Sequence, residues 1–547
     1  MVSNSADTDH PVPVKGRNGR CFQFGLRSRK ARALATPFCL CAAFIGLLAR
    51  ESLPAELQSR WVRLDSSGKL VYEVLPSGDR IMDFSSAGYM GGGVRIPSPP
   101  VSKIVRPSGG DDTAAIQEAI DAVSRQSLVG GFRGAVLLEQ GAFRCKATLA
   151  IRASGVVLRG SGSGPNVTTI EMTGSPHGCI SIAGPRSASA VGNPVTITDA
   201  YVPSGTNSFH VRDAAQFHAG DSVIISRPIT RSLIEFMGMD KLVRDGQRET
   251  WLAAGSEILT ERTIQSISGD LIALDIPLTD SLDANYLNPP GATVAKRDAA
   301  DRISQVGVEN LRIVSPPQPV TIGQPHHSGI RLSNATDCWV RDVAIRDTVG
   351  SVSLGSATSR ITVERVDVAH SVATLGGPKP ADFSADGTQI LIDNCSATGD
   401  NLFYFVTGAR VTGPIVLLNC TFHGNGHVEP HQRWATGLLV DNCHVPEGGI
   451  DFMNRGEMGS GHGWTMGWAV AWNCSAKSFV IQQPPGAANW AIGCQGAREA
   501  APMPFGNGPK LPEGIYDSHG TRVAPTSLYL EQLTERLASE AQRKTGH

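Results

Sequence analysis

Polar, charged and aromatic side chains concentrate in two short stretches of the C-terminal part of the sequence. The first stretch, HGNGHVEPHQRWATG, carries His423, His427, Glu429, His431, Arg433 and Trp434. The second stretch, DFMNRGEMGSGHGWTMGW, carries Asp451, Asn454, Arg455, Glu457, His462, Trp464 and Trp468. Together these residue types supply acids, bases, cations and flat apolar faces, so we treat the two stretches as candidate parts of one site.

A site of this composition has the three functions needed to break a uronic-acid polymer by β-elimination. A cation must offset the sugar carboxylate, a base must remove the C5 proton, and an acid must protonate the leaving oxygen. We expect Arg433 and Arg455 to hold the carboxylate, because a guanidinium presents a planar fork of donors. We expect His431 or His462 to be the base, since histidine titrates near neutrality. The other of these two, or His427, would be the acid.

A second group of side chains is predicted to bind the polysaccharide substrate. This group comprises Trp434, Trp464, His427, Glu429, Asn454 and Glu457. The tryptophan rings would offer faces on which sugars stack, although packing inside the protein is the structural alternative. The histidines and arginines likewise have an alternative role in bracing their loops. Residues further upstream could edge the same groove, namely His326, His327, His370, Lys379, Asp382 and Asp386.

Two other functions compete with a lyase. The tripeptide Gly461-His462-Gly463 also occurs in polygalacturonase-type glycosidases, but the aspartates and the basic motif that accompany it there are missing here. An inverting glycoside hydrolase could still use Glu429 with Asp451 or Glu457, if their carboxyl groups stood roughly 6.5 to 9.5 Å apart. The third alternative is a non-catalytic glycan-binding or adhesion protein in which the tryptophans bind sugar.

The sequence requires no metal and no cofactor. Calcium is compatible with the carboxylates of Asp451, Glu457 and Glu429, because this ion prefers oxygen ligands. Zinc is not expected, because the chain has no CxxC pair and no His/Cys cluster with ligand spacing.

A repeated unit that ends in Asn-Cys or its equivalent fixes the scaffold that must position these loops. Clear copies read QILIDNCSA, IVLLNCTF, LLVDNCHV, AVAWNCSA and NWAIGCQG. The repeats align on Leu311, Val343, Val366, Cys395, Cys420, Cys443, Cys474 and Cys494. A spacing of roughly 20 to 30 residues with β-type units predicts a stacked solenoid. Its coils would lie about 4.8 Å apart, so the two polar loops should project side by side.

The Asn-Cys pairs are expected to form ladders that point into the solenoid. Stacked inward cysteines behave as small hydrophobic residues, so we interpret them as structural thiols and not as disulfides. The asparagine side chains would cap backbone groups at the turns.

The composition agrees with one large turn-rich β protein. The 547 residues include 60 glycines and 34 prolines, with only 6% aromatic residues. The net charge of −1 offers no basic field, so we expect no nucleic-acid partner.

The segment SGGDDTAAIQEAIDAV predicts a helix that covers the first coil. Asp111 and Asp112 can cap its N-terminus. Ala115, Ile116, Ala119, Ile120 and Val123 follow at helical spacing. Such a helix would hide the open edge of the solenoid.

The segments GDDTAAIQEAID and GAVLLEQGAFRC, with VLRGSGSG and the Asn-Cys repeats, resemble the pectate-lyase-like superfamily of right-handed parallel β-helix proteins. The resemblance covers roughly residues 80–500. It implies an all-β fold, a right-handed parallel β-helix, and membership of a group that contains polysaccharide lyases, glycoside hydrolases, uronate epimerases and phage tailspikes. Fold alone does not decide among these functions.

Five segments are expected along the chain. Residues 1–49 form a leader, and residues 50–182 hold N-terminal strands, the capping helix and the first coils. Residues 183–300 interrupt the repeat pattern and read as a small inserted β-domain. Residues 301–500 are the C-terminal coils with the site loops. Residues 501–547 form a tail whose helix, with Leu530, Leu533 and Leu537 on one stripe, would cover the final coil.

The leader resembles an export signal. Basic residues between Lys15 and Arg32 precede an apolar stretch over residues 33–49. We therefore predict a secreted or periplasmic protein without a stable membrane span in the mature chain. An uncleaved membrane anchor is the alternative.

Overall fold

The computed structural model describes residues 57–185, 192–297, 302–319, 321–500 and 511–545. The predicted leader, residues 1–49, lies outside these residues. None of the helices in the described ranges is long and apolar enough to cross a membrane.

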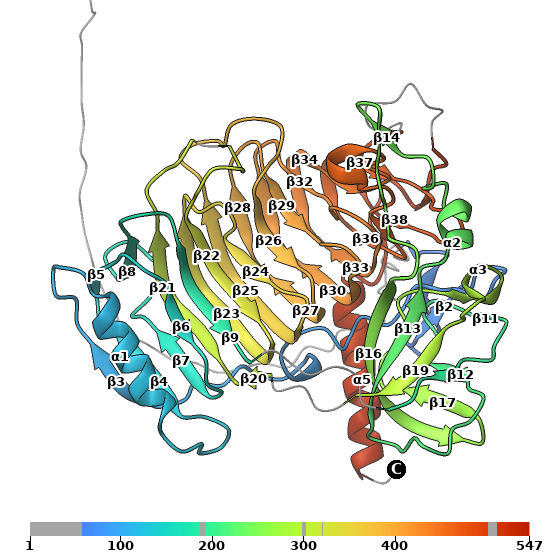
Figure 1. Ribbon diagram of the computed structural model, residues 1–547, viewed down its shortest axis with the longest axis horizontal. Helices are drawn as coiled ribbons and strands as arrows, with labels where there is room; N and C mark the ends of the chain where they lie inside the picture. The colour runs from blue at the N-terminus through green and yellow to red at the C-terminus, as the bar shows by residue number, and fades with distance from the viewer. Residues whose placement is uncertain (1–56, 186–191, 298–301, 320, 501–510, 546–547) are drawn as a thin grey trace, which may run out of the picture. The chain divides into compact units, whose positions relative to one another are not determined.

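The chain is an all-β parallel β-helix whose coils are built from three longitudinal stacks of parallel strands (Figure 1). The first stack contains β3 (Val101–Val105), β4 (Gly134–Leu138), β7 (Val156–Arg159), β21 (Gly307–Val314), β23 (Ala335–Arg346), β25 (Thr358–Ala369), β27 (Thr388–Asp393), β30 (Thr412–Leu418), β33 (Ala435–Asp441), β36 (Val470–Trp472), β38 (Trp490–Ile492) and β40 (Ile515–Asp517). These strands follow one another in register along the stack, as the repeat spacing predicts.

The other two stacks follow in the same order. The second contains β5 (Gly141–Cys145), β8 (Thr168–Met172), the C-terminal halves of β21, β23 and β25, then β28 (Ser396–Thr398), β31 (Thr421–His423), β34 (His444–Phe452), β37 (Ser475–Ile481) and β39 (Gln495–Arg498). The third contains β6 (Leu149–Ile151), β9 (Gly178–Ala183), β22 (Ser328–Ser333), β24 (Val352–Leu354), β26 (Ala381–Ala385), β29 (Phe403–Val406), β32 (His427–Val428) and the second halves of β34 and β37.

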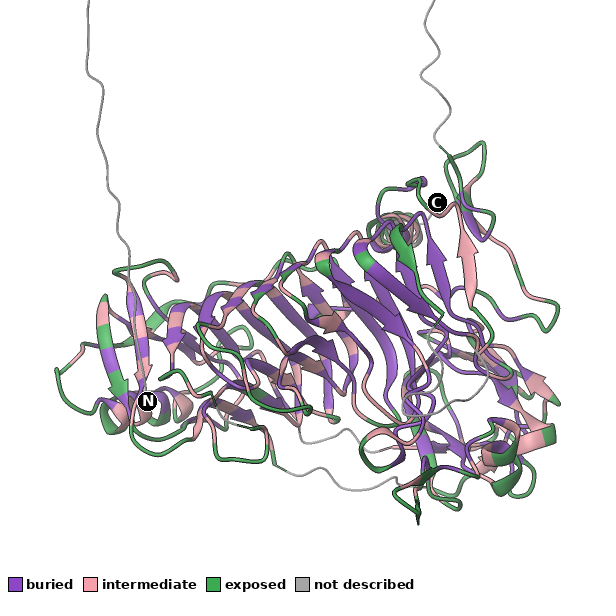
Figure 2. Cartoon of the chain, turned by 90° about the horizontal axis from the view of Figure 1, so that it is seen from above, coloured by how far each residue is buried: buried purple, intermediate pink, exposed green. Residues whose placement is uncertain are grey.

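The alignment of the repeats is confirmed, but only one member of each Asn-Cys pair points inward. Leu311 pairs with Val343, and Val343 with Val366. The five aligned cysteines that follow are buried free thiols in the core. Their Sγ atoms donate to backbone carbonyls, as Cys474 does to the Val440 oxygen at 3.1 Å. The strands of the coils are buried over most of their length (Figure 2).

The prediction that the asparagines form a second inward ladder is wrong. They occupy the left-handed region of the backbone, with φ near 50° at Asn394 and 53° at Asn419 and Asn442. Glycine takes the same place at Gly493, with φ 66°. Asparagine is selected here because it tolerates this conformation better than most residues. Asn394 is exposed and Asn442 donates to the Asn419 side chain at 2.7 Å, so these amides lie along the outer corner of the coils. The predicted capping of backbone groups is confirmed at Asn473, whose buried amide donates to the Val523 carbonyl at 2.8 Å and accepts the Val523 N–H at 2.9 Å.

We expect Asn394→Ala to lower the free energy of unfolding by about 1 kcal/mol, because alanine bears the steric cost of the left-handed region. Asn394→Gly should cost less, since glycine adopts this conformation without a Cβ clash. Chemical denaturation of both variants measures the difference. Equal losses would contradict a backbone origin.

Helix α1 (Thr113–Ser124) lies against the first coil, as predicted. Its buried Ile116, Ile120 and Val123 join the core of the β-helix. The Asp111 side chain accepts the Thr113 N–H at 3.2 Å, whereas the Asp112 side chain accepts the N–H groups of Ser108 and Arg144. The acidic pair therefore fixes the start of the helix.

The interruption of the repeats holds a separate six-stranded antiparallel sheet (Figure 1). Its strands, in spatial order, are β10 (Val195–Thr196), β19 (Thr293–Lys296), β13 (Ser222–Pro228), β16 (Glu257–Ser268), β17 (Leu271–Leu274) and β12 (Ser208–His210). After the insertion β21 pairs with β7 and β8, so the stack of coils continues without a gap. Apolar residues of the insertion share one buried cluster with Leu439, Val470 and Trp472 of the C-terminal coils.

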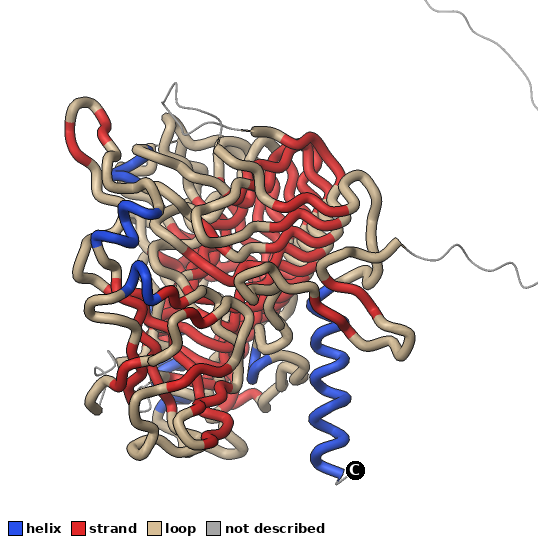
Figure 3. The backbone as a smooth tube through the Cα atoms, turned by 90° about the vertical axis from the view of Figure 1, so that its right-hand side faces the viewer, coloured by secondary structure: helices blue, strands red, loops and turns tan. Residues whose placement is uncertain are grey.

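Helix α5 (Leu528–Thr545) lies beside the coils, and the prediction that it covers the final coil is wrong (Figure 3). Its start is held by Asp441 at the end of β33, which accepts the Tyr529 N–H at 2.8 Å. Gln532 binds the backbone of Met82 and Phe84. Leu530 is 45% exposed, so the leucine stripe does not face a coil as a whole.

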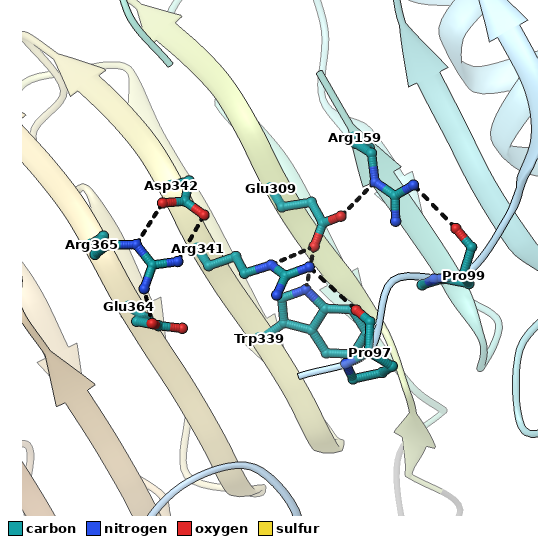
Figure 4. A network of polar contacts seen from close by, with 9 residues as sticks. All are labelled: Pro97, Pro99, Arg159, Glu309, Trp339, Arg341, Asp342, Glu364 and Arg365. Carbon is teal, nitrogen blue, oxygen red and sulfur yellow. Dashed lines mark hydrogen bonds and ion pairs between the residues drawn. The ribbon is translucent and has the colours of Figure 1, made fainter. Parts of the chain in front are cut away.

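An N-terminal segment, residues 79–100, runs along the outside of the coils. Gly88 N donates to the Gln389 oxygen, and Tyr89 N donates to Thr362 Oγ1. Further along, the Pro97 carbonyl accepts a hydrogen bond from Arg341, and the Pro99 carbonyl accepts one from Arg159 (Figure 4). Both arginines also form ion pairs with Glu309. We call this segment the strap.

Candidate functional site

The two polar loops lie side by side, as the stacking of coils predicts. His427 pairs with Gly449 and Val428 with Ile450, so Glu429 and Asp451 fall at neighbouring positions of adjacent coils. β32 and β34 lie side by side (Figure 1). Arg433 N donates to the His462 oxygen at 2.9 Å, and this hydrogen bond joins the loop after β32 directly to the loop after β34. The side chains discussed below therefore belong to one group.

His427 and Asp451 form the first pair in this group. His427 Nδ1 lies 2.6 Å from Asp451 Oδ2. Burial alone would lower the pKa of His427, but the hydrogen bond and the charge of Asp451 outweigh it and raise the pKa. Asp451 is 4% exposed, and its second oxygen, Oδ1, is buried without a hydrogen-bond partner among the described residues. The pair therefore orients the His427 ring and favours its protonated form.

Glu429 and Arg455 form the second pair, with a separation of 2.5 Å between Oε1 and the guanidinium nitrogen. Both side chains are largely buried. Burial raises the pKa of Glu429 to about 7, and the charge of Arg455 opposes this rise only in part. Glu429 can therefore carry a proton near neutral pH.

His431 and His462 form the third pair, with ring centroids 4.7 Å apart. His431 Nδ1 lies 3.2 Å from an Arg455 guanidinium nitrogen and accepts a hydrogen bond from it, which places the ring N–H of the neutral imidazole on Nε2. Burial, followed by the charge of Arg455, lowers the pKa of His431 to about 3 and that of His462 to about 4. Both imidazoles are therefore neutral across the physiological pH range.

Arg433 lies at the edge of the group. Its guanidinium donates to the Ser460 backbone and side chain, to the Thr250 carbonyl at 3.3 Å and to Gln432 Oε1 at 3.2 Å. No ion pair joins it to a carboxylate in the part of the chain that the structure describes. Neutral partners fix its position and leave its charge uncompensated.

Some predicted roles do not fit the burial of the residues. Trp434 and Trp464 are each 2% exposed, so they have no ring face on which a sugar could stack. Their indole N–H groups bind Asp280 Oδ2 and the Met237 carbonyl of the insertion, so both rings pack the insertion against the coils. Arg455 is already paired with Glu429 and is 4% exposed, which does not suit the predicted clamp on a substrate carboxylate.

Asn454 and Glu457 are also placed differently from the prediction. Asn454 is 1% exposed, and its Oδ1 accepts the Gly456 N–H at 2.8 Å. Its amide therefore shapes the turn and does not bind substrate. Glu457 is half-buried at the start of the short helix α4 (Met458–Gly461).

Three residues near the group were absent from the predicted centre. Phe403 of β29 lies under it, with the Arg455 guanidinium carbon 5.4 Å and Lys379 Nζ 5.7 Å from its ring centroid. The sequence predicts Lys379 only as a residue at the groove edge. Arg244 of the insertion donates to the Gly459 carbonyl, and its charge lowers the pKa of His462. In the apolar segment NLFYFV, Phe403 is predicted to be a core residue, so the sequence gives no reason to place it in the site. No sequence signal connects Arg244 of the insertion to this loop.

Of the other residues considered for the groove edge, His370 and Asp382 form a separate pair at 2.7 Å. His327 is buried and its ring contacts that of His177, at a centroid distance of 5.0 Å. These contacts lie on earlier coils and give no evidence of a role in the site.

The donor set does not suit calcium. One ligand atom each from His427, Glu429 and Asp451 lie within 4.8 Å of one another in the described part of the chain. One of these atoms is an imidazole nitrogen, whereas calcium prefers six to eight oxygen ligands. Arg455 and Lys379 also place positive charge beside the carboxylates. Calcium binding is therefore an untested prediction, and the chemistry of these residues argues against it.

The fold and the group of side chains define a parallel β-helix protein with a cation-rich and histidine-rich site on its third stack of strands. No family model and no curated protein matches the sequence. Among solved structures, the tailspike protein of E. coli bacteriophage HK620 in complex with a pentasaccharide shows 10% identity and a TM-score of 0.38, and the alignment covers 81% of this chain and 61% of the tailspike.

Two further tailspikes are similar at the same low level. The Gp54 tailspike of Acinetobacter baumannii bacteriophage AP22, in complex with capsular saccharide, shows 10% identity and a TM-score of 0.27, over 74% of this chain and 71% of that chain. The gp49 tailspike of Pseudomonas phage LKA1 shows 14% identity and a TM-score of 0.28, over 71% and 69%.

Proposed function

We propose that the protein is an exported polysaccharide lyase that cleaves a uronic-acid-containing glycan by β-elimination. The observation that carries this proposal is the pair of neutral imidazoles, His431 and His462, held 4.7 Å apart beside two arginines. The resemblance of the sequence to the pectate-lyase-like superfamily agrees with the proposal.

The residues divide the reaction among them. Arg433, whose charge no described carboxylate neutralises, binds the uronate carboxylate and makes the C5 proton more acidic. His431 or His462 removes that proton, and the electrons form the double bond between C4 and C5 as the C4–O bond breaks. Glu429 or protonated His427 gives a proton to the departing oxygen. Burial, followed by the charge of Arg455, keeps the two histidine bases neutral, and Arg455 also holds Glu429 in place.

The pH dependence of turnover follows from these pKa values. We expect kcat/KM to stay nearly constant between about pH 4 and pH 7. Below that range the histidine base, with a pKa lowered to about 3 or about 4, becomes protonated. Above it Glu429, with a pKa raised to about 7, loses the proton that it donates. A pH profile of wild type and Glu429→Gln checks this assignment, since the variant should lose the basic limb. An acidic limb at pH 6.5 in the wild type would contradict the role of buried histidines.

A retaining glycoside hydrolase is the second candidate. The nearest ligand atoms of Glu429 and Asp451 lie within 4.8 Å, which is shorter than the roughly 6.5 to 9.5 Å of inverting enzymes and close to the 5 to 5.5 Å of retaining ones. An inverting mechanism with this pair is therefore disfavoured. A glycan-binding protein that uses Trp434 and Trp464 is disfavoured by their burial.

Incubation of the purified protein with a panel of uronate glycans tests the proposal. A lyase releases unsaturated ends that absorb in the near ultraviolet. A hydrolase releases reducing ends without this absorbance, and that result would overturn the lyase assignment. Cleavage of no uronate glycan, together with cleavage of a neutral one, would overturn the substrate class.

A further inference from the structure

A cavity of about 410 Å³ opens between the insertion and the C-terminal coils, apart from the histidine group. Its walls come from the chain after β2 (Leu70–Tyr72), from α2 (Arg231–Phe236) and α3 (Ala284–Leu287) of the insertion, and from residues 483–487. This volume falls within the range of small-molecule sites in proteins.

Aromatic side chains line the cavity, and of these Trp434 and Trp468 are nearly fully buried and form a fixed wall, whereas the rings of Phe236 and Tyr286 are partly open. One carboxylate, that of Asp280, accepts the indole N–H of Trp434 at 2.7 Å and that of Trp468 at 3.1 Å. Phe236 and Tyr286, which also line the cavity, stack with ring centroids 3.9 Å apart. Both of these rings are half-buried, so part of each is open to solvent or to a ligand.

The cavity also carries net negative charge. Among the described residues that line it, Asp79, Asp280 and Asp283 are acidic and Arg227 alone is basic. Arg227 is paired with Asp280 at 3.4 Å. Asp79 accepts the Tyr201 hydroxyl at 2.6 Å and the Ser204 N–H, and within the described ranges neither Asp79 nor Asp283 has a basic partner in an ion pair. Asp283 accepts the Asn285 N–H at 2.9 Å at the start of α3. Two carboxylates are therefore hydrogen-bonded but have no described cation beside them to compensate their charge.

We propose that this cavity binds a small organic cation with an alkylammonium group. Aromatic rings attract such cations through their negative faces, and the attraction grows when the cation is desolvated. Uncompensated carboxylates in a partly buried cavity add to it and repel a uronate carboxylate. This site goes beyond the proposed lyase function and does not depend on it.

Calorimetric titration with choline and with its uncharged isostere 3,3-dimethyl-1-butanol tests the proposal. We expect choline to bind at least tenfold more tightly, because the two molecules share a shape and differ in charge. Phosphatidylcholine vesicles form a second arm, and vesicle binding without binding of free choline would identify a lipid headgroup as the source of the ammonium group. Equal binding of the two isosteres, or no binding of choline in either form, would overturn the proposal.

Two substitutions locate the binding to this cavity. Tyr286→Leu should weaken choline binding by about 5- to 30-fold through the loss of the ring. Asp283→Asn should weaken choline binding but leave the weak binding of the neutral isostere unchanged. Tyr516→Leu, which alters a half-buried tyrosine of β40 outside the cavity, is the matched control. Loss of affinity in the control alone would place the cation elsewhere, and thermal melting of each variant verifies folding.

Discussion

Replacing His431 or His462 by alanine is expected to reduce turnover of a uronate glycan by roughly 10²- to 10⁴-fold, the range that general acid–base groups contribute. Each substitution removes one of the two neutral imidazoles that are placed to take the C5 proton. The measurement is the rate of appearance of unsaturated products under saturating substrate. Circular dichroism and thermal melting of the variants report whether the fold is kept.

His423→Ala is the matched control for this experiment. His423 lies in the same loop region, at the end of β31, but its side chain is about half exposed and its ring faces Glu447 at 3.6 Å. The control should keep full activity. If the His431 and His462 variants also keep full activity, neither histidine is the base.

Glu309→Gln is expected to lower the free energy of unfolding by about 3–5 kcal/mol, because it removes one partner of a buried ionic network. Glu309 is completely buried and binds Arg159 at 2.5 Å, Arg341 at 2.9 Å and the Trp339 indole at 2.8 Å (Figure 4). Glutamine carries no charge, so Arg159 and Arg341, whose side chains are mostly buried, would lose the carboxylate that neutralises them. Chemical denaturation measures the loss.

Glu364→Gln is the control for position and residue type. Glu364 follows Glu309 and Arg341 at the same position of the first stack, but its side chain is 23% exposed. Its partner Arg365 is also held by Asp342 at 2.7 Å. A loss below about 1 kcal/mol is expected, as for other exposed pairs. Equal losses for the two variants would contradict the role of burial.

The sequence predicted the coil stack well, because repeated spacing reports directly on register. The alignment on Leu311, Val343, Val366 and the five cysteines matches the pairing of strands. The same pattern could not separate an inward asparagine from one at a left-handed corner, since both recur with the coil. The repeat pattern also could not predict the position of α5, because its partners Met82 and Phe84 are distant in sequence.

The site was predicted in part for the same reason. Stacking alone brings Glu429 next to Asp451 and His431 next to His462, so these contacts follow from the repeats. The burial of Trp434 and Trp464 depends on where the insertion packs, and no periodicity encodes that contact. Composition marked the tryptophans as prominent but could not tell whether their faces were open.

The strap has a consequence for how the molecule comes apart. Coils that touch only their neighbours can fray from either end, one after another. Here a single outer segment is hydrogen-bonded to Gln389, Thr362, Arg341 and Arg159, which belong to four of the five consecutive coils from β7 to β27. Peeling away one terminal coil therefore disturbs contacts several coils distant. We expect the strap to couple opening of the ends to loss of the middle, which would leave proteases few partly unwound forms to attack.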